Sequence, residues 1–168
     1  MSRAFVNEDQ LTQTLALPER KVSTHPNYVT PRGLALLKSR FAELESERSM
    51  LLKQDDVSSH ERLAAVERDL RYYAARVKSA KLVPPSSRTP EHVKFGCRVT
   101  VATPSGEEIT YTLVGEDEAD AEHDLISWIS PLGQALLGAH EGDQVQWQRP
   151  AGEVALEVVK IEAPESKP

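Results

Sequence analysis

Two periods of hydrophobic positions divide the chain. Between residues 30 and 83, apolar side chains recur every three or four positions, which is the spacing of one face of an α-helix. After residue 92 they alternate with polar side chains, as in a strand with one buried face. Residues 83–90, between the two regions, contain three prolines, which cannot continue a helix. The pattern predicts a helical part, a linker at 84–92 and a sheet-forming part.

The helical part, residues 29–83, is predicted to be two long helices joined by a polar turn. Thr30 is a good N-cap and Pro31 suits a first helical position. Ser58 and Glu61 have capping-box spacing, so we expect the second helix to begin at Ser58. Each helix would hold about 23 residues, or roughly 35 Å. One apolar seam per helix predicts an antiparallel coiled-coil hairpin. Its positions are Leu34, Leu37, Phe41, Leu44, Leu51 and Leu52, then Leu63, Val66, Leu70, Tyr73, Val77, Ala80 and Leu82.

The sheet-forming part, residues 93–162, is predicted to be a mostly antiparallel sheet with one short helix at 132–137. Ser130 and Pro131 would begin this helix and Gly138 would end it. The fold class is therefore α+β. Residues 1–28 form an N-terminal extension that we expect to be partly disordered, and residues 163–168 a frayed tail. The expected strands are 93–101, 108–114, 125–129, 144–148 and 154–161.

Composition excludes several classes of protein. With 168 residues, 39% of them hydrophobic, the chain fits one ordinary domain or two small ones. It has no apolar run of roughly 18 residues and no signal-like start, and its single cysteine, Cys97, cannot form an internal disulfide. These features favour a cytoplasmic protein without a membrane span. The net charge of −6 argues against a protein that coats nucleic acid.

The sequence does not predict an independent active site or a cofactor of its own. Cys97 lies in an alternating strand pattern typical of a small buried hydrophobe. The five histidines lack zinc-ligand spacing, and neither a phosphate-binding glycine loop nor a Gly-x-Ser-x-Gly motif occurs.

An ordered series of short motifs resembles the Gre transcription elongation factors over residues 29–162. In the C-terminal half these are VGEDEAD at 114–120, LIS at 125–127, SPL at 130–132, ALLG at 135–138, GD at 142–143 and PAGE at 150–153. TPRG at 30–33 and LV at 82–83 resemble the two ends of the family's helical hairpin. Residues 1–28 lie outside the resemblance.

The resemblance implies an FKBP-like C-terminal domain that docks at the rim of the bacterial RNA polymerase secondary channel, with the coiled coil inserted into that channel. It also implies that hairpin-tip acids help to hold a second Mg²⁺ in the polymerase active site. Such a metal activates water, and one or two carboxylates suffice to position it. The corresponding candidates are Asp55 and Asp56, with Glu61 behind them. The docking candidates are Trp128, Ile129, Ser130, Pro131 and Leu132.

The sequence departs from the family at the hairpin tip. The hairpin is about fifteen residues shorter, which removes roughly 11 Å of reach when spread over two arms. The family's Gly-Asp and Glu-Asn tip signature has no direct counterpart, and Ile129 stands where a polar residue usually precedes Ser-Pro. Cleavage stimulation is therefore less strongly predicted than docking.

Each candidate also has a structural interpretation. Asp55 and Asp56 could form a polar turn in which Asp56 caps the second helix. Trp128 could be a core strand residue, and the acidic run 116–122 could be a solvated loop. A hairpin face could either line an acidic channel or remain solvated with ion pairs along the helix. Its residues are Arg62, Arg68, Arg71, Arg76, Lys78 and Lys81.

The functional prediction is a monomeric regulator that is not an enzyme. Its partner is bacterial RNA polymerase, and it contacts nucleic acid, including DNA, only within the transcription complex. It would modulate backtracking, pausing or transcript cleavage, or alternatively occupy the channel without stimulating cleavage. A less favoured alternative is a peptidyl-prolyl isomerase, for which this half offers Phe95, Tyr111, Trp128 and Trp147. A third possible function is that of a coiled-coil adaptor that dimerises through the hairpin.

Overall fold

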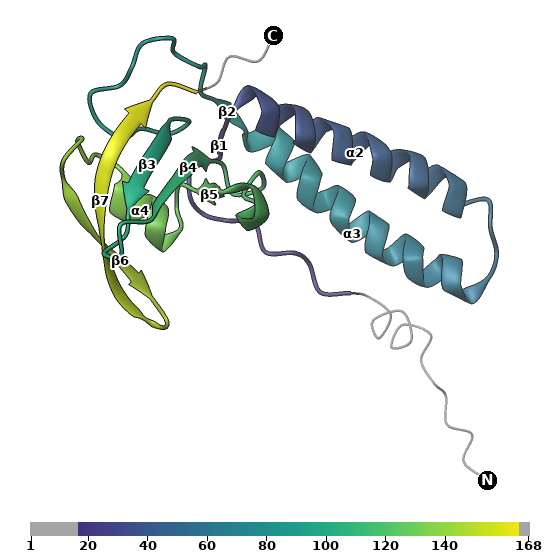
Figure 1. Cartoon of the computed structure of the whole chain (residues 1–168). Coiled ribbons are helices and arrows are strands. Elements are labelled where there is room, and N and C mark those ends of the chain that lie inside the picture. The colour runs from purple at the N-terminus through teal and green to yellow at the C-terminus, as the bar shows by residue number, and fades with distance from the viewer. Residues whose placement is uncertain (1–16, 165–168) are drawn as a thin grey trace. The chain divides into compact units, whose positions relative to one another are not determined.

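The computed structural model describes residues 17–164, which fall into two compact units (Figure 1). One unit contains residues 17–24 and 37–79, and the other contains residues 25–36 and 80–164. The predicted α+β class is confirmed, with two long helices and a mostly antiparallel sheet. No helix among the described residues has the length and apolar character of a membrane span.

The helical unit is built on α2 (Pro31–Leu51) and α3 (Val57–Ser79). Leu37, Leu44 and Val66 are buried in the seam of this hairpin. Ion pairs join the two helices at Arg62–Glu47 and Arg48–Glu67. The first helix begins at Pro31 as predicted, whereas α3 ends three residues before the predicted Leu82.

The second helix ends early because the next residues form a strand. Lys81–Leu82 is β2, which pairs in parallel with β1 (Tyr28–Val29). Two-residue strands carry no periodic signal, so the sequence did not reveal this pair. Gly115 packs tightly beside it, since a Cβ atom at Gly115 would lie 2.4 Å from the Tyr28 carbonyl oxygen.

The five-stranded sheet has the order β5-β4-β3-β7-β6, and all pairs are antiparallel except β4–β5. Its strands are β3 (Arg98–Ala102), β4 (Glu108–Val114), β5 (Leu125–Ser127), β6 (Gln144–Arg149) and β7 (Gly152–Glu162). A register shift at Thr100/Val101 accompanies the bend of β7 visible in Figure 1. The short helix α4 (Pro131–Leu136) packs on the sheet, and a 3-10 turn, η1 (Ala121–His123), precedes β5.

The core of the sheet unit combines strand residues with α4. Its buried members include Val99, Leu113, Leu136 and Val158. Cys97 is 2% exposed in this core, and burial raises the pKa of its thiol, so its prediction as a small buried hydrophobe is confirmed.

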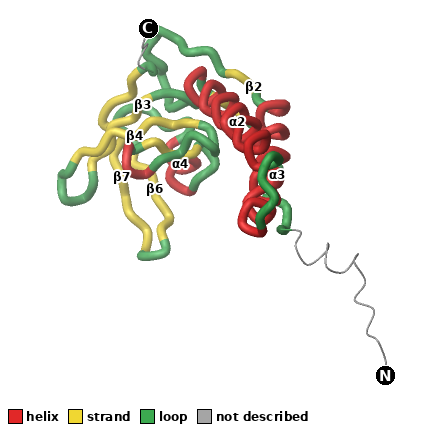
Figure 2. The backbone as a smooth tube through the Cα atoms, turned by 90° about the vertical axis from the view of Figure 1, so that its right-hand side faces the viewer, coloured by secondary structure: helices red, strands yellow, loops and turns green. Residues whose placement is uncertain are grey.

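The strand predicted at 93–101 begins only at Arg98. Gly96 adopts a positive φ of 86°, which an extended strand does not accommodate. The residues between β2 and β3 form the long green loop in Figure 2. Likewise, the strand predicted at 125–129 ends at Ser127, where the chain turns into the cap of α4.

Candidate functional site

The turn at the end of the helical hairpin is organised by Asp56. Its carboxylate accepts hydrogen bonds from the Ser59 backbone N–H at 2.8 Å and from the Ser58 and Ser59 hydroxyls at 2.6 and 2.8 Å. The Asp56 carbonyl accepts the first helical bond, from His60 N–H. Asp56 is therefore the N-cap, which confirms its interpretation as a helix cap, and the prediction that the helix begins at Ser58 is wrong. A carboxylate has two oxygens with which to collect these donors, whereas a serine hydroxyl has one.

These hydrogen bonds favour the charged form of the cap. The Ser58 hydroxyl and then the Ser59 donors lower the pKa of Asp56 from 3.8 to about 2. Because the folded-state pKa lies below the unfolded one, the stabilisation by the charged cap is fully present above pH 3.8. It is lost as the pH falls through about 2.

We predict that Asp56→Ala lowers the thermal midpoint of the hairpin by a few degrees at pH 7, because a cap is removed. Asp55→Ala is the matched control, since the Asp55 side chain is fully exposed. Circular dichroism melts of both variants test this prediction. Equal midpoints for the two variants would show that the cap does not hold α3.

Asp55 is the accessible carboxylate of the turn. Its side chain is 100% exposed and lies 3.4 Å from His60 Nε2. Within residues 17–164, no group of three or more His, Cys, Asp or Glu side chains could hold a metal. Asp55 is thus the turn carboxylate that the helix cap does not use, and Glu61 is exposed behind it in α3. A partner would have to supply further ligands to a Mg²⁺ ion held here.

Exposed apolar side chains lie on both sides of these acids along the chain, a feature that the sequence interpretation missed. Met50, Leu52 and Val57 are 64%, 55% and 74% exposed. Leu52 was assigned to the apolar seam, but α2 ends at Leu51 and leaves Leu52 in the turn. A signal was available in the sequence, because residues 50–52 are three apolar residues in succession, which one seam of a helix cannot all join.

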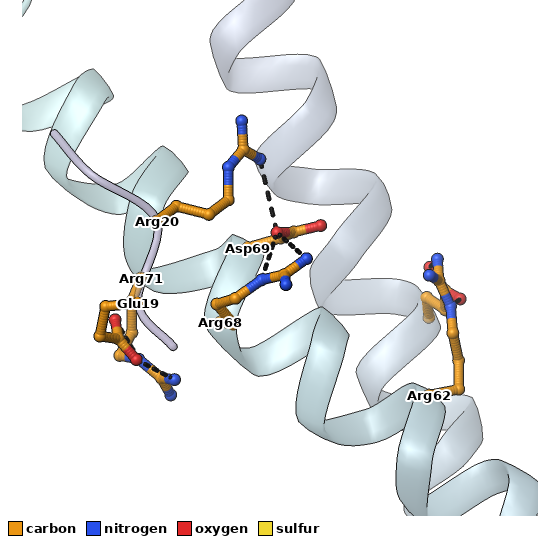
Figure 3. Close-up of polar contacts among 7 residues, drawn as sticks. Glu19, Arg20, Arg62, Arg68, Asp69 and Arg71 are labelled. Carbon is orange, nitrogen blue, oxygen red and sulfur yellow. Dashed lines mark hydrogen bonds and ion pairs between the residues drawn. The ribbon is translucent and has the colours of Figure 1, made fainter. Parts of the chain in front are cut away.

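The basic residues of α3 do not form one free cationic face. Arg62 is paired with Glu47, and Arg71 with Glu19 (Figure 3). Arg68 is paired with its neighbour Asp69. Arg76 is only 1% exposed, so neither of its two interpretations, as a channel-lining or as a solvated residue, is correct.

In the sheet unit, the loop between β5 and α4 is held in place by its own hydrogen bonds. The Ser130 hydroxyl donates to the Ser127 carbonyl at 2.6 Å and accepts from the Gly133 N–H at 3.1 Å. The Gln134 side-chain amide donates to the Trp128 carbonyl at 2.8 Å. A Cβ atom at Gly133 would lie 2.3 Å from the Ser127 carbonyl oxygen. The predicted Ser130 cap is confirmed, and the loop is rigidly positioned.

The five docking candidates differ in exposure. Pro131 is exposed, and Trp128, Ile129 and Ser130 are half-buried. Leu132 is 5% exposed and belongs to the core cluster. Its side chain therefore anchors the loop to the core and does not line the surface. The helical period explains the difference, since neighbouring residues in a first turn point about 100° apart.

Trp128 belongs to an aromatic group that the sequence did not predict. Its ring lies 5.3 Å from that of Tyr28 and 6.2 Å from that of His25, centroid to centroid. Tyr28 also contacts Phe95 at 6.0 Å. Trp128 Nε1 is buried without a hydrogen-bond partner. Trp128 thus packs against His25 and Tyr28 of the N-terminal extension and remains half-buried.

Glu118 is a buried member of the acidic run at 116–122. It is 8% exposed and accepts hydrogen bonds from Thr30 Oγ1 at 2.5 Å and Arg32 Nη1 at 3.1 Å. The interpretation of the entire run as a solvated loop is therefore wrong at this residue. A carboxylate beside the first turn of α2 also interacts favourably with the helix dipole.

A cavity of about 490 Å³ lies under the loop that follows β2. Of the four aromatic residues considered for a prolyl isomerase site, only Phe95 lines it. Trp128 lies in the group described above, and the Trp147 ring faces Arg149. The described residues do not bring the four rings into one pocket.

Comparison with known proteins matches the chain to one family. Residues 88–163 match the family model "Transcription elongation factor, GreA/GreB, C-term". GreB of Neisseria meningitidis serogroup B is 31% identical over 152 residues, which cover 81% of this chain and 93% of the relative. GreA of Desulfovibrio desulfuricans is 31% identical over 154 residues, covering 83% and 95%.

Solved structures give matches of lower identity. The GreA/GreB factor from Nitrosomonas europaea is 24% identical, covers 81% of this chain and 98% of that chain, and has a TM-score of 0.40. Gfh1 of Thermus thermophilus is 22% identical, covers 82% and 99%, and also has a TM-score of 0.40. On the sequence matches, which extend over both units, the chain belongs to the GreA/GreB family of transcription elongation factors.

Proposed function

We propose that this chain is a cytoplasmic, monomeric Gre-type factor that binds bacterial RNA polymerase at the secondary channel and modulates backtracking, pausing or transcript cleavage. It has no catalytic activity or cofactor of its own and meets nucleic acid only within the transcription complex. The observation that carries the proposal is the 31% identity to a named elongation factor, over 93% of that relative's length. The proposal also includes an FKBP-like fold for the sheet unit and a coiled-coil arrangement of the two long helices.

The docking surface in this proposal is formed by Trp128, Ile129, Ser130 and Pro131. Their loop has internal hydrogen bonds and a glycine that allows close packing, so it is ordered before binding. A preordered loop loses little conformational entropy when a partner binds. Leu132 acts indirectly, by anchoring the exposed Pro131 above the core.

The hairpin tip is the part that would approach the polymerase active centre. A second Mg²⁺ there would supply an activated water, and Asp55 is the residue of this chain that would hold it. Asp56 instead orders the tip, because both of its oxygens accept hydrogen bonds from the first turn of α3.

A specific observation favours the second form of the proposal, in which the factor occupies the channel without stimulating cleavage. Of the two tip acids, one is engaged as a cap, and exposed Met50, Leu52 and Val57 flank the other. The hairpin is also about fifteen residues shorter than the family's, or roughly 11 Å in reach. An apolar tip in which one of the two turn carboxylates is engaged as a cap is suited to occupying space more than to positioning a metal.

Binding to purified bacterial RNA polymerase tests the proposal. We expect a specific complex that a longer Gre factor displaces. The variant Asp55→Asn/Asp56→Asn should bind with unchanged affinity, because the side-chain oxygen of asparagine still caps the helix and the tip contributes little docking surface. A failure of the wild-type protein to bind would reject the proposal, and loss of binding in the double variant would reject the assignment of docking to the sheet unit.

A further inference from the structure

An extended segment of the N-terminal region lies against α3 within the helical unit. We call residues 17–22 the clasp. Figure 3 shows Glu19 and Arg20 reaching from this segment to the helix. The Arg71 Nε atom lies 3.0 Å from both carboxylate oxygens of Glu19, and Arg71 Nη2 donates to the same group. The clasp lies outside the region that resembles the family.

The second clasp residue engages a charged and an aromatic group together. Arg20 Nη1 lies 3.4 Å from Asp69 Oδ1, which also accepts from Arg68. The Arg20 guanidinium carbon is 3.9 Å from the centroid of the Tyr72 ring and 5.4 Å from that of Tyr73. Asp69, Tyr72 and Tyr73 are three and four residues apart and share one helix face. The clasp therefore covers a defined flank of α3.

These contacts are suited to reversible attachment. The Arg71 and Glu19 side chains remain 56% and 62% exposed, and Arg20 remains 37% exposed. Exposed ion pairs and cation–π contacts are individually weak. Residues 17–22 also form no helix or strand that would fix them through backbone hydrogen bonds. The clasp thus covers the flank without belonging to a core.

We propose that residues 17–22 form an autoinhibitory clasp, which covers the α3 flank around Asp69, Arg71 and Tyr72 and must detach before that flank contacts a partner. The inference rests on the proposed function for the identity of the partner, RNA polymerase. A segment that neutralises Arg71 and covers Tyr72 removes a cation and an aromatic face from the surface available for contact. When only the open fraction binds, the apparent affinity falls by that fraction.

The test compares full-length wild-type protein with Glu19→Ala/Arg20→Ala. The control, Arg40→Ala/Glu43→Ala, removes an exposed pair of the same two residue types, 3.2 Å apart on the other helix, α2. In ¹⁵N relaxation measurements, we expect the backbone N–H groups of residue 17 and residues 19–22 to be as ordered as those of α3 in the wild type and the control, residue 18 being a proline without an N–H. In the clasp variant they should become as mobile as a free chain end. Unchanged order in the clasp variant would overturn the inference.

The second readout is affinity for RNA polymerase. We expect the clasp variant to bind about fivefold more tightly than the wild type, and the control to bind like the wild type. Detachment without tighter binding would overturn autoinhibition while leaving the proposed function intact. Binding by the clasp variant alone would support the inference. If none of the three proteins binds, the proposed function fails and autoinhibition of polymerase binding fails with it.

Discussion

Replacing Gly133 with alanine is expected to lower the free energy of unfolding of the sheet unit by about 3 kcal/mol. The added Cβ atom would meet the Ser127 carbonyl oxygen at 2.3 Å and the Trp128 carbonyl oxygen at 2.9 Å. Both are backbone atoms, so the clash is relieved only if β5 and α4 move apart. That movement would also disrupt the Ser130 hydrogen bonds that hold the loop. Chemical denaturation followed by tryptophan fluorescence measures the effect.

The chain provides a matched control in Gly33. Both glycines are the third residue of a helix that begins with a capping hydroxyl and a proline, at Thr30-Pro31 and Ser130-Pro131. A Cβ atom at Gly33 meets the Glu118 Oε1 atom at 2.7 Å, which is the end of a side chain that can shift. Because that shift would lengthen the hydrogen bond from Thr30 Oγ1 to Glu118, we expect Gly33→Ala to cost about 1 kcal/mol, less than Gly133→Ala. Equal costs at the two glycines would show that close backbone packing does not position the loop.

Neighbouring substitutions at positions 131 and 132 should separate binding from folding. Leu132→Asp is expected to cost about 4 kcal/mol or more, because it places an unpaired carboxylate in the core beside Leu136 and Val145. Pro131→Asp should leave the fold intact, because residue 131 is exposed and an acidic residue is favourable in a first helical turn. If Pro131 contacts polymerase, the same substitution should weaken binding at least tenfold.

Thermal melts and polymerase-binding titrations of the two variants distinguish these roles. A folded Pro131→Asp protein with unchanged affinity would place the docking surface elsewhere. A stable Leu132→Asp protein would contradict the burial of this residue.

The sequence predicted the main elements because their signals are local. The Thr30-Pro31 and Ser130-Pro131 pairs mark helix starts by capping chemistry, and residues 108–114 alternate strictly enough to define β4 to the residue. The β1–β2 pair was missed because it joins residues 28–29 to residues 81–82, with no period in either. The start of β3 was misplaced because Gly96 breaks an alternation that otherwise continues.

The candidate sites were predictable in position but less so in role. The tip acids and the Ser-Pro loop could be found from residue type and order. Three-dimensional contacts then decided between the two interpretations of Asp56 in favour of the cap, and assigned Leu132 to the core and Glu118 to the first turn of α2. Each of these roles depends on residues that are close in space, or on the side of a helical turn to which the side chain points. The contacts of Glu19 and Arg20 with α3 could not be predicted at all, since they join residues about 50 positions apart without a sequence pattern.

RNA cleavage in a purified, backtracked bacterial elongation complex with Mg²⁺ tests the central claim most directly. The rate of cleavage is measured in four reactions: the complex alone, the complex with this protein, the complex with a longer Gre factor, and the complex with both proteins. We predict that the protein does not accelerate cleavage and that it inhibits the longer factor, as expected of a channel occupant whose Asp56 is engaged as a helix cap. Faster cleavage that is lost in Asp55→Asn/Asp56→Asn would contradict this account and make the tip acids functional metal ligands.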